Sequence, residues 1–329
     1  MKNKIVICFL FLVQVCDAQQ RSAIVAFWNV ENYYAPFSDS LKRDPAFSPQ
    51  GVNHWTWSRF ITKRDAMAKA IIAMSAEEPP VIIGLCEVEN RFVLEQLVKQ
   101  TPLSFAGYRI VHRDGPDERG VDVALLYRPD RFRVLSTRFF TVRLPDPLQF
   151  TREILYTKGV LDDLDTLHLF VNHWPSKWGG AKASMGRRLA AAQRLGTSVD
   201  SIFSLLPCAN IVIMGDFNDT PKSKVLQALN KERPLQNLSA PLARKKQGTI
   251  RYRGRWELID QFIVSEHLLC IEEPIYTSAD QCRIFTAPFL LIPDEKFLGM
   301  KPFRTYLGPR YQGGISDHLP VILQIKRKY

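Results

Sequence analysis

The stretch IVIMGDFNDTP, residues 211–221, runs four apolar residues directly into a polar cluster. A short, continuous apolar run is typical of a strand that is buried on both faces of its sheet. Asp216, Asn218 and Asp219 follow where this strand ends. In α/β folds the ends of strands hold side chains rigidly at the solvent edge, which is where sites form. The stretch therefore predicts an α/β fold with a polar site at a sheet edge.

Similar apolar runs recur along the chain, with helical periodicity between them. The strand-like runs are residues 22–30, 80–88, 121–129, 152–161, 166–174, 210–217, 257–265 and 319–326, and the helical segments are residues 58–75, 90–100 and 181–206. No linker or fixed-period repeat interrupts this alternation. We expect a single domain over residues 19–329, a sandwich of two packed sheets with helices outside. Residues 266–312 have no clear period, so we expect a long, partly structured excursion there.

The first residues have the features of a secretory signal peptide. Two lysines precede the apolar run of residues 5–13, and Ala18 offers a small residue at a cleavage point. The run is too short to span a membrane. We therefore expect residues 1–18 to be removed and the protein to be exported, into a periplasm or outside the cell. Lipid attachment at Cys16 is the alternative that we rank second.

The chain is basic. Removal of residues 1–18 takes two lysines and one aspartate from 44 basic and 33 acidic side chains, which leaves 42 against 32. Such a charge favours polyanions as partners, namely nucleic acid, anionic lipid headgroups or phosphorylated sugars, although it can also serve solubility alone.

Four cysteines remain after residue 18, without the spacing of a zinc site or a disulfide scaffold. Cys86 lies inside an apolar run and is expected to be a small buried hydrophobe. Cys270 and Cys282 share one irregular segment of an exported chain, and we hypothesise a disulfide between them.

Polar clusters occur at the edge of six apolar runs. They are WNVEN (28–32), LCEVEN (85–90), FVNHW (170–174), MGDFND (214–219), ELID (257–260) and SDHLP (316–320). One such cluster alone is usually a turn or a helix cap, but independent caps would rarely produce six. If the strand ends converge, they bring together Asn29, Glu31, Glu87, His173, Asp216, Asn218, Asp260, Asp317 and His318.

Five carboxylates in one pocket repel each other unless a cation neutralises some of them. Oxygen ligands without a cysteine or histidine cage favour Mg²⁺, with Mn²⁺ or Ca²⁺ as alternatives. The imidazoles suit acid–base work and stabilisation of a charged oxygen, with Asp260 available to hold one of them. Asp216 can take a proton from water while Asn218 holds that water or a phosphate oxygen. Together these groups indicate hydrolysis of a phosphate ester.

The motifs WNVEN, CEVEN, NHWPS, GDFND and SDHLP, in this order, resemble those of the endonuclease/exonuclease/phosphatase superfamily. The resemblance covers residues 22–326, and the runs of residues 119–132 and 172–188 are similar to those of its secreted bacterial members. It implies a four-layered α/β sandwich with a divalent metal, usually Mg²⁺, at one end of the two sheets.

The resemblance also implies roles for individual residues. Glu87 is similar to the principal metal ligand, with Asn29 and Asp317 beside it and Glu31 further out. Asp216 resembles the residue that activates water and Asn218 its positioner. His318 resembles the histidine that stabilises or protonates the phosphoryl group, held by Asp260, and His173 resembles a second catalytic histidine. Lys177 and Arg187 are candidate phosphate contacts, with solvated side chains as the alternative.

We expect an exported, metal-dependent, non-specific endonuclease that cleaves DNA or RNA. It is expected to be a monomer without a stable protein partner. A sphingomyelinase-like or phosphoinositide-phosphatase-like enzyme is the alternative, with residues 285–293 as a candidate hairpin for inserting into a bilayer. A non-catalytic binder on the same fold is a third possibility. We further expect basic and aromatic residues of 296–311 to form a wall beside SDHLP, suited to polynucleotides or to an anionic headgroup.

Overall fold

The computed structural model describes residues 22–37, 44–177, 179–180 and 182–328. The predicted signal peptide and Cys16 lie outside these residues. Within the described part of the chain, no helix has the length and apolar character needed to cross a membrane.

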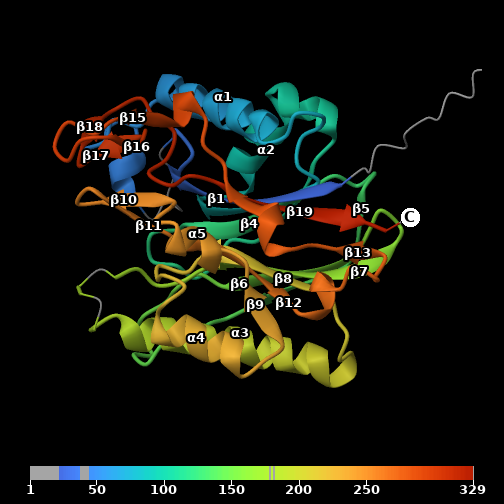
Figure 1. The fold of residues 1–329 in the computed structure, drawn as a ribbon. Coiled ribbons are helices and arrows are strands. Elements are labelled where there is room, and N and C mark those ends of the chain that lie inside the picture. Colours follow the sequence, from blue (N-terminus) through green and yellow to red (C-terminus); the bar gives the residue numbers. More distant parts are fainter. Residues whose placement is uncertain (1–21, 38–43, 178, 181, 329) are drawn as a thin grey trace, which may run out of the picture.

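Two mixed sheets form the centre of the molecule (Figure 1). The first sheet has the order β13-β19-β1-β2-β4-β3, with β14 also pairing with β19. Its strands are β1 (Ala23–Tyr33), β2 (Ile82–Val88), β3 (Arg109–His112), β4 (Asp122–Tyr127), β13 (Ile275–Tyr276), β14 (Cys282–Ile284) and β19 (Val321–Arg327). Its β1–β2 pair is parallel and the others are antiparallel.

The second sheet has the order β5-β6-β7-β8-β12-β9. Its strands are β5 (Phe132–Phe140), β6 (Ile154–Leu161), β7 (Asp165–His173), β8 (Ile211–Asp216), β9 (Leu235–Asn237) and β12 (Asp260–Ser265). Only its β7–β8 pair is parallel.

Helices cover the outer face of each sheet (Figure 1). Helices α1 (Trp57–Ala73) and α2 (Arg91–Lys99) lie on the first sheet, and α3 (Met185–Leu205) and α4 (Lys224–Lys231) on the second. A short fifth helix, α5 (Ala240–Arg244), follows β9. Small two-stranded sheets are formed by β10 (Ile250–Tyr252) with β11 (Arg255–Glu257), β15 (Leu291–Pro293) with β16 (Met300–Pro302), and β17 (Tyr306–Leu307) with β18 (Arg310–Tyr311).

Alternation along the strands explains the layers. In β8, Ile211 and Ile213 point to the core shared with α3 and α4, whereas Val212 and Met214 point to the core between the sheets. In β1, Phe27 faces the other sheet, whereas the next residue, Trp28, packs in the core beneath the helices. A strand buried on both faces must be apolar at successive residues, which is what the opening stretch shows. The four-layered sandwich predicted from the sequence is therefore confirmed.

Residues 266–312 are partly structured, as expected, because their strands are only two or three residues long. Strands β13 and β14 nevertheless join the edge of the first sheet by pairing with β19, so this part of the segment belongs to the fold. The expectation of a bilayer hairpin is wrong, because Phe285, Ala287 and Leu290 are buried in the core beneath the helices of the first sheet. The apolar character of the stretch thus serves packing.

The hypothesised disulfide between Cys270 and Cys282 is also wrong. Both thiols are free, with Cys270 exposed and Cys282 buried. Cys282 Sγ lies 3.5 Å from Ser239 Oγ instead. As part of β14, Cys282 packs into the core between the sheets, where the exposed Cys270 does not reach it.

Strands β7 and β8 lie so close together at Gly215 that no side chain fits there. A Cβ atom there would lie 2.6 Å from both the Cβ and the carbonyl oxygen of Asn172, its partner on β7. Backbone cannot move aside cheaply, so Gly215→Ala should lower the free energy of unfolding by about 1–3 kcal/mol in urea denaturation.

Gly186 is the matched control. It lies in α3, where the nearest atom to an added Cβ is Pro145 Cγ at 3.8 Å. Gly186→Ala should leave stability unchanged or raise it by up to about 1 kcal/mol, because alanine is the better helix former. Equal unfolding free energies for the two variants would contradict the tight β7–β8 contact.

Candidate active site

The strands that carry the polar clusters are neighbours, and their polar ends meet at one edge of the sandwich. In the second sheet, Asp216 is paired with His173 on β7 and with Asp260 on β12. In the first sheet, β1 and β2 run parallel and pair Asn29 with Cys86, so Glu87 follows beside the end of β1. The convergence expected from the sequence is thus built from strand register.

Three of these residues have left-handed backbone conformations. The φ angles are +50° for Glu31, +62° for Glu87 and +50° for Asn218. The register of β1 and of β2 with their neighbours shifts at the first two positions. Such conformations are rare for residues other than glycine and gather at functional sites, where they re-aim side chains.

A polar pocket of about 360 Å³ opens between these strand ends. It is lined by Glu87, Arg119, Arg152, His173, Ser176, Arg187, Asp216, Asn218 and His318. The structure therefore brings together six of the residues predicted for the site: the two histidines, Glu87, Asp216, Asn218 and Arg187.

His318 is held by Asp260. Its Nδ1 lies 2.7 Å from Asp260 Oδ2, and Asp260 is fully buried. Burial alone would lower the pKa of His318, but the carboxylates of Asp260, Asp216 and Asp317 raise it well above its usual value. His318 is therefore an imidazolium at neutral pH, and its Nε2 proton is available at the pocket.

The loop that carries His318 is fixed by three hydrogen bonds. Ser316 Oγ donates to the carbonyl oxygen of Asn29 at 2.6 Å, and His318 N donates to Ser316 Oγ at 3.0 Å. Trp28 Nε1 donates to the carbonyl oxygen of His318 at 2.9 Å. The SDH motif is thus tied to β1, which carries the first polar cluster.

Asp216 is held by a different pair of donors. Asn218 N donates to its Oδ1 at 2.8 Å and Asn29 Nδ2 donates to its Oδ2 at 3.0 Å. Burial, followed by the negative charge of Asp260, raises the pKa of Asp216 to about 7. His318 and the two donors lower this pKa, but by less than burial and Asp260 raise it. A carboxyl group with a pKa near the working pH is suited to act as a general base.

His173 and Glu87 lie next to Asp216. His173 Nε2 is 3.7 Å from Asp216 Oδ2 and 3.8 Å from Glu87 Oε1. Burial lowers the pKa of His173 far below its usual value, so the ring is neutral. Burial would raise the pKa of Glu87, but Arg119, the two histidines and the N–H of Asn32 together hold it well below its usual range. Glu87 is therefore a permanent anion in the pocket.

Arg304 joins Glu31 and Asp317, neither of which lines the pocket, although Asp317 Oδ1 lies 3.8 Å from Nε2 of the lining residue His318. The Arg304 guanidinium lies 3.0 Å from Glu31 Oε1 and 2.9 Å from Asp317 Oδ2. Thr305 N donates to the other Glu31 oxygen at 2.7 Å, and the buried Lys63 donates to the Glu31 carbonyl. Both carboxylate oxygens of Glu31 are thus occupied by the chain itself.

Only one of the two predicted phosphate contacts lines the pocket. Arg187 lines the pocket, whereas Lys177 Nζ lies outside its lining, 3.6 Å from Asp219 Oδ1 and 3.9 Å from Glu257 Oε2. Arg304 of the expected basic and aromatic wall does lie beside SDHLP, through its ion pair with Asp317. Tyr306 is instead buried against Phe47 and Trp55.

Sequence reasoning missed three residues of the pocket: Arg119, Arg152 and Ser176. Arg152 is buried, and its guanidinium donates to Asp117 Oδ2 and to the carbonyl of Trp174, both at 2.9 Å. It stands in the short polar run of residues 151–153 directly before β6, so the pattern that selected the other clusters could have marked it too. Arg119 lies 3.5 Å from Glu87 Oε1. It is the first residue of the run 119–132, whose similarity to family members could have pointed to it.

The donor set fits a hard divalent cation. Carboxylate oxygens of Glu87 and Asp317, with the amide oxygen of Asn29, are ligands of the kind that Mg²⁺ and Mn²⁺ prefer. Ligand atoms of Asp216, Asp260 and His318 lie within 4.8 Å of one another, but an imidazolium at His318 has no lone pair for a metal. Those of Cys86, His173 and Asp216 also lie within 4.8 Å of one another. Burial raises the pKa of the Cys86 thiol, which makes it a poor ligand.

Solved structures of similar fold come from bacteria and animals. An endonuclease/exonuclease/phosphatase family protein of Bacteroides thetaiotaomicron superposes with a TM-score of 0.56 at 17% identity, covering 94% of this chain and 100% of that one. The human nocturnin catalytic domain, solved with a sulfate anion, gives 0.58 at 16% identity over 93% and 95%. TDP2 of D. rerio, complexed with a single-strand DNA product, gives 0.56 at 14% identity over 93% and 99%.

At these identities the solved structures show a common fold and nothing about substrate. No curated protein has a sequence similar enough to count as a relative. The model of the endonuclease/exonuclease/phosphatase family, in contrast, matches residues 24–327, from β1 to β19. The chain belongs to the endonuclease/exonuclease/phosphatase family.

Proposed function

We propose that this phosphoesterase-fold protein is an exported, divalent-metal-dependent nuclease that hydrolyses phosphodiester bonds of DNA or RNA without sequence specificity. The charge of the pocket carries the proposal. Three arginines and the imidazolium of His318 line it, against the carboxylates of Glu87 and Asp216. Asp117 and Asp260 pair with Arg152 and His318 from behind the lining, so the pocket presents arginine and imidazole donors in a fixed arrangement. Fixed cationic donors in a polar pocket favour an anionic phosphate group as substrate.

The chain supplies both an acid and a base for hydrolysis. Asp216, oriented by Asn29 and Asn218, takes the proton of an attacking water. His318, held by Asp260 and carrying a proton on Nε2, stabilises the phosphoryl oxygens or protonates the leaving oxygen. The 4.0 Å between His318 Nε2 and Asp216 Oδ2 leaves the two groups side by side without a direct hydrogen bond. The proton can therefore stay on His318 while Asp216 is ionised, so one group is available as the acid and the other as the base.

The remaining pocket residues position the phosphate. Arg152 is fixed by Asp117 and by the carbonyl of Trp174, and is therefore preorganised to meet an anion. Arg119 and Arg187 extend the positive lining. A bound Mg²⁺, held by Glu87 with Asn29 and Asp317, would polarise the phosphoryl group as a Lewis acid.

Plasmid cleavage tests the proposal. Residues 19–329 should nick supercoiled plasmid or degrade RNA with Mg²⁺, lose this activity with EDTA, and regain it when Mg²⁺ is added back. A His54→Ala variant, changed at an exposed histidine away from the pocket, should behave as wild type. A preparation inert on both nucleic acids with Mg²⁺, Mn²⁺ and Ca²⁺ would remove the nuclease proposal and leave the pocket to another phosphate ester.

A phospholipid headgroup is the second candidate substrate, and one feature favours it. The hairpin of β15 and β16 has an exposed apolar tip beside Lys296, where Phe297 is 43%, Leu298 80% and Met300, the first residue of β16, 41% exposed. Apolar tips flanked by lysine are suited to a membrane surface. Release of phosphocholine or of inorganic phosphate from vesicles, lost in a Phe297→Ser, Leu298→Ser variant, would favour this candidate. If the protein turns over neither class of lipid, this candidate is excluded.

Export and a monomeric state belong to the same proposal. The N-terminal sequence pattern supports cleavage after Ala18 and the absence of a lipid on Cys16. The intact mass of the protein recovered from an expressing bacterium tests cleavage, since an unprocessed chain or a lipid adduct would contradict it. A substrate-binding protein without activity is the remaining alternative, and turnover in the plasmid assay excludes it.

A further inference from the structure

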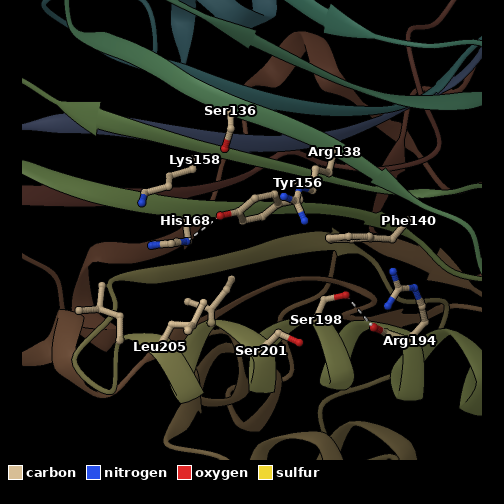
Figure 2. Close-up of a pocket in the computed structure, with 12 residues that line it drawn as sticks. Ser136, Arg138, Phe140, Tyr156, Lys158, His168, Arg194, Ser198, Ser201 and Leu205 are labelled. Atoms are coloured by element: carbon tan, nitrogen blue, oxygen red, sulfur yellow. Dashed lines mark hydrogen bonds between the residues drawn. The ribbon is translucent and has the colours of Figure 1, made fainter.

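A second pocket, of about 500 Å³, lies on the outer face of the second sheet beneath α3 (Figure 2). It shares no lining residue with the active-site pocket. Nothing in the proposed catalysis uses it, and it has a chemistry of its own.

Strand register builds one wall of this pocket. Ser136, Lys158 and His168 form one row across β5, β6 and β7, because Lys158 pairs with both of the others. Arg138 pairs with Tyr156 in the next row. Residues two apart on a strand point to the same face, so all five side chains face α3.

One face of α3 builds the other wall. The residues Arg194, Ser198, Ser201, Ile202 and Leu205 recur at helical spacing and line the pocket. The adjoining stripe of Ala191, Leu195 and Val199 is buried in the core against the sheet. Figure 2 shows the strand side chains and the helix side chains facing each other across the pocket.

The lining is cationic and amphipathic. Arg138, Lys158 and Arg194 contribute positive charge, and no acidic residue is among the described residues that line the pocket. Arg194 stacks over the ring of Phe140, with 4.4 Å to its centroid, which fixes the guanidinium. Leu205 is 87% exposed at the rim, beside the half-exposed Leu206. A site with cations on both walls and apolar residues at the end of α3 matches an anion attached to an apolar body.

A buried polar atom without a partner adds independent support. Tyr156 Oη and His168 Nδ1 lie 2.9 Å apart, and both residues are more than nine-tenths buried. His168 Nε2 is buried and has no hydrogen-bond partner in the part of the chain that the structure describes. Buried polar atoms are almost always satisfied, so this nitrogen, closed to solvent in the present arrangement, is an exception directly beside the pocket.

We propose that this pocket binds a small anionic amphiphile, a phosphate monoester or carboxylate joined to a short alkyl chain or a single ring system. Arg138 and Lys158 receive the anionic group, and Ile202, Leu205 and Leu206 receive the apolar part. A lipid fragment and a nucleotide both have this chemistry. The site is separate from the phosphoesterase site and does not depend on the substrate proposed there.

Histidine NMR tests this proposal, because the chain has six histidines and they report on different places. The protein is labelled at histidine Cε1, and the His168 signal is assigned with His168→Gln. Octyl phosphate and adenosine monophosphate are titrated separately, with EDTA present, beside the neutral octyl glucoside. The His168 signal should shift saturably with one of the two anions, while the signals of His173 and His318 report any binding at the active site.

Two variants decide the role of the cations. Arg138→Gln with Lys158→Gln should weaken the binding seen at His168 by about tenfold or more, because charged hydrogen bonds to the anion are lost. Arg133→Gln is the matched control, since Arg133 is exposed on the same strand and outside the pocket. If only octyl phosphate shifts the His168 signal, the ligand is lipid-like. If only adenosine monophosphate shifts it, the ligand is a nucleotide. The proposal is overturned if neither anion moves the His168 signal, if octyl glucoside moves it equally, or if the control weakens binding as much.

Discussion

Replacing His318 by glutamine is expected to lower kcat on a nucleic-acid substrate by a factor on the order of 10³, with a much smaller change in KM. The reason is that an imidazolium proton at the pocket serves the transition state, where charge develops on the phosphoryl and leaving oxygens. Glutamine keeps a hydrogen-bond donor but cannot supply positive charge or a proton. Steady-state kinetics with Mg²⁺ measures the effect.

His54→Gln is the control for this variant, because His54 is exposed on the surface and lines no part of the pocket. Thermal unfolding of the His318 variant has to be followed as well, since the change leaves Asp260 and Asp216 buried without their cationic partner. A folded His318→Gln variant with kcat within a few fold of wild type would contradict the role assigned to this imidazole.

The sequence predicts the central strands well because they are buried on both faces. Continuous apolar runs that are too short for a helix and end in polar residues, such as residues 211–214, favour buried strands, and all eight predicted runs form strands. Strand β5 was missed because it lies at the sheet edge and alternates exposed and half-buried residues, so it has no apolar run. The helices α4 and α5 are too short for a clear period.

The candidate site could be predicted only where residues cluster along the chain. Asn29, Asp216 and His318 stand in compact motifs at strand ends, and the structure places them together. Arg152 reaches the pocket from a run of only three polar residues, 151–153, which resembles none of the family motifs named above. The ion pair of Glu31 with Arg304 joins residues 273 positions apart, and no local pattern shows that Arg304 rather than the pocket receives this carboxylate. Long-range pairing of this kind is therefore what could not be predicted from the sequence.

The wild-type pH profile of kcat/KM is expected to be bell-shaped. Asp216 acts as a base only when it is ionised, and its pKa is raised to about 7 by burial and by Asp260, so activity rises as pH increases through about 7. His318 acts only when it is protonated, and its pKa is raised well above its usual value, so activity falls at more alkaline pH. The negative charge of Asp260 raises both of these pKa values.

Asp260→Asn should therefore shift the whole profile toward acid and lower its maximum by a factor on the order of 10³. Without the carboxylate, the pKa of His318 falls, so the alkaline limb moves to lower pH. The pKa of Asp216 falls for the same reason, and the acid limb follows. The loss at the maximum arises because the neutral amide of this variant no longer holds the charged ring in its orientation, the function that a buried carboxylate serves beside a catalytic histidine.

Asp200→Asn is the matched control for this experiment. Asp200 is an exposed carboxylate on α3 that pairs with Arg233, so its removal should leave both limbs in place. A loss of activity in Asp260→Asn with the alkaline limb unmoved would mean that Asp260 only supports the fold around the site. A shift of that limb, with unfolding free energy close to that of the control, would instead establish that Asp260 sets the charge of His318, because a merely structural carboxylate has no means of moving a kinetic pKa.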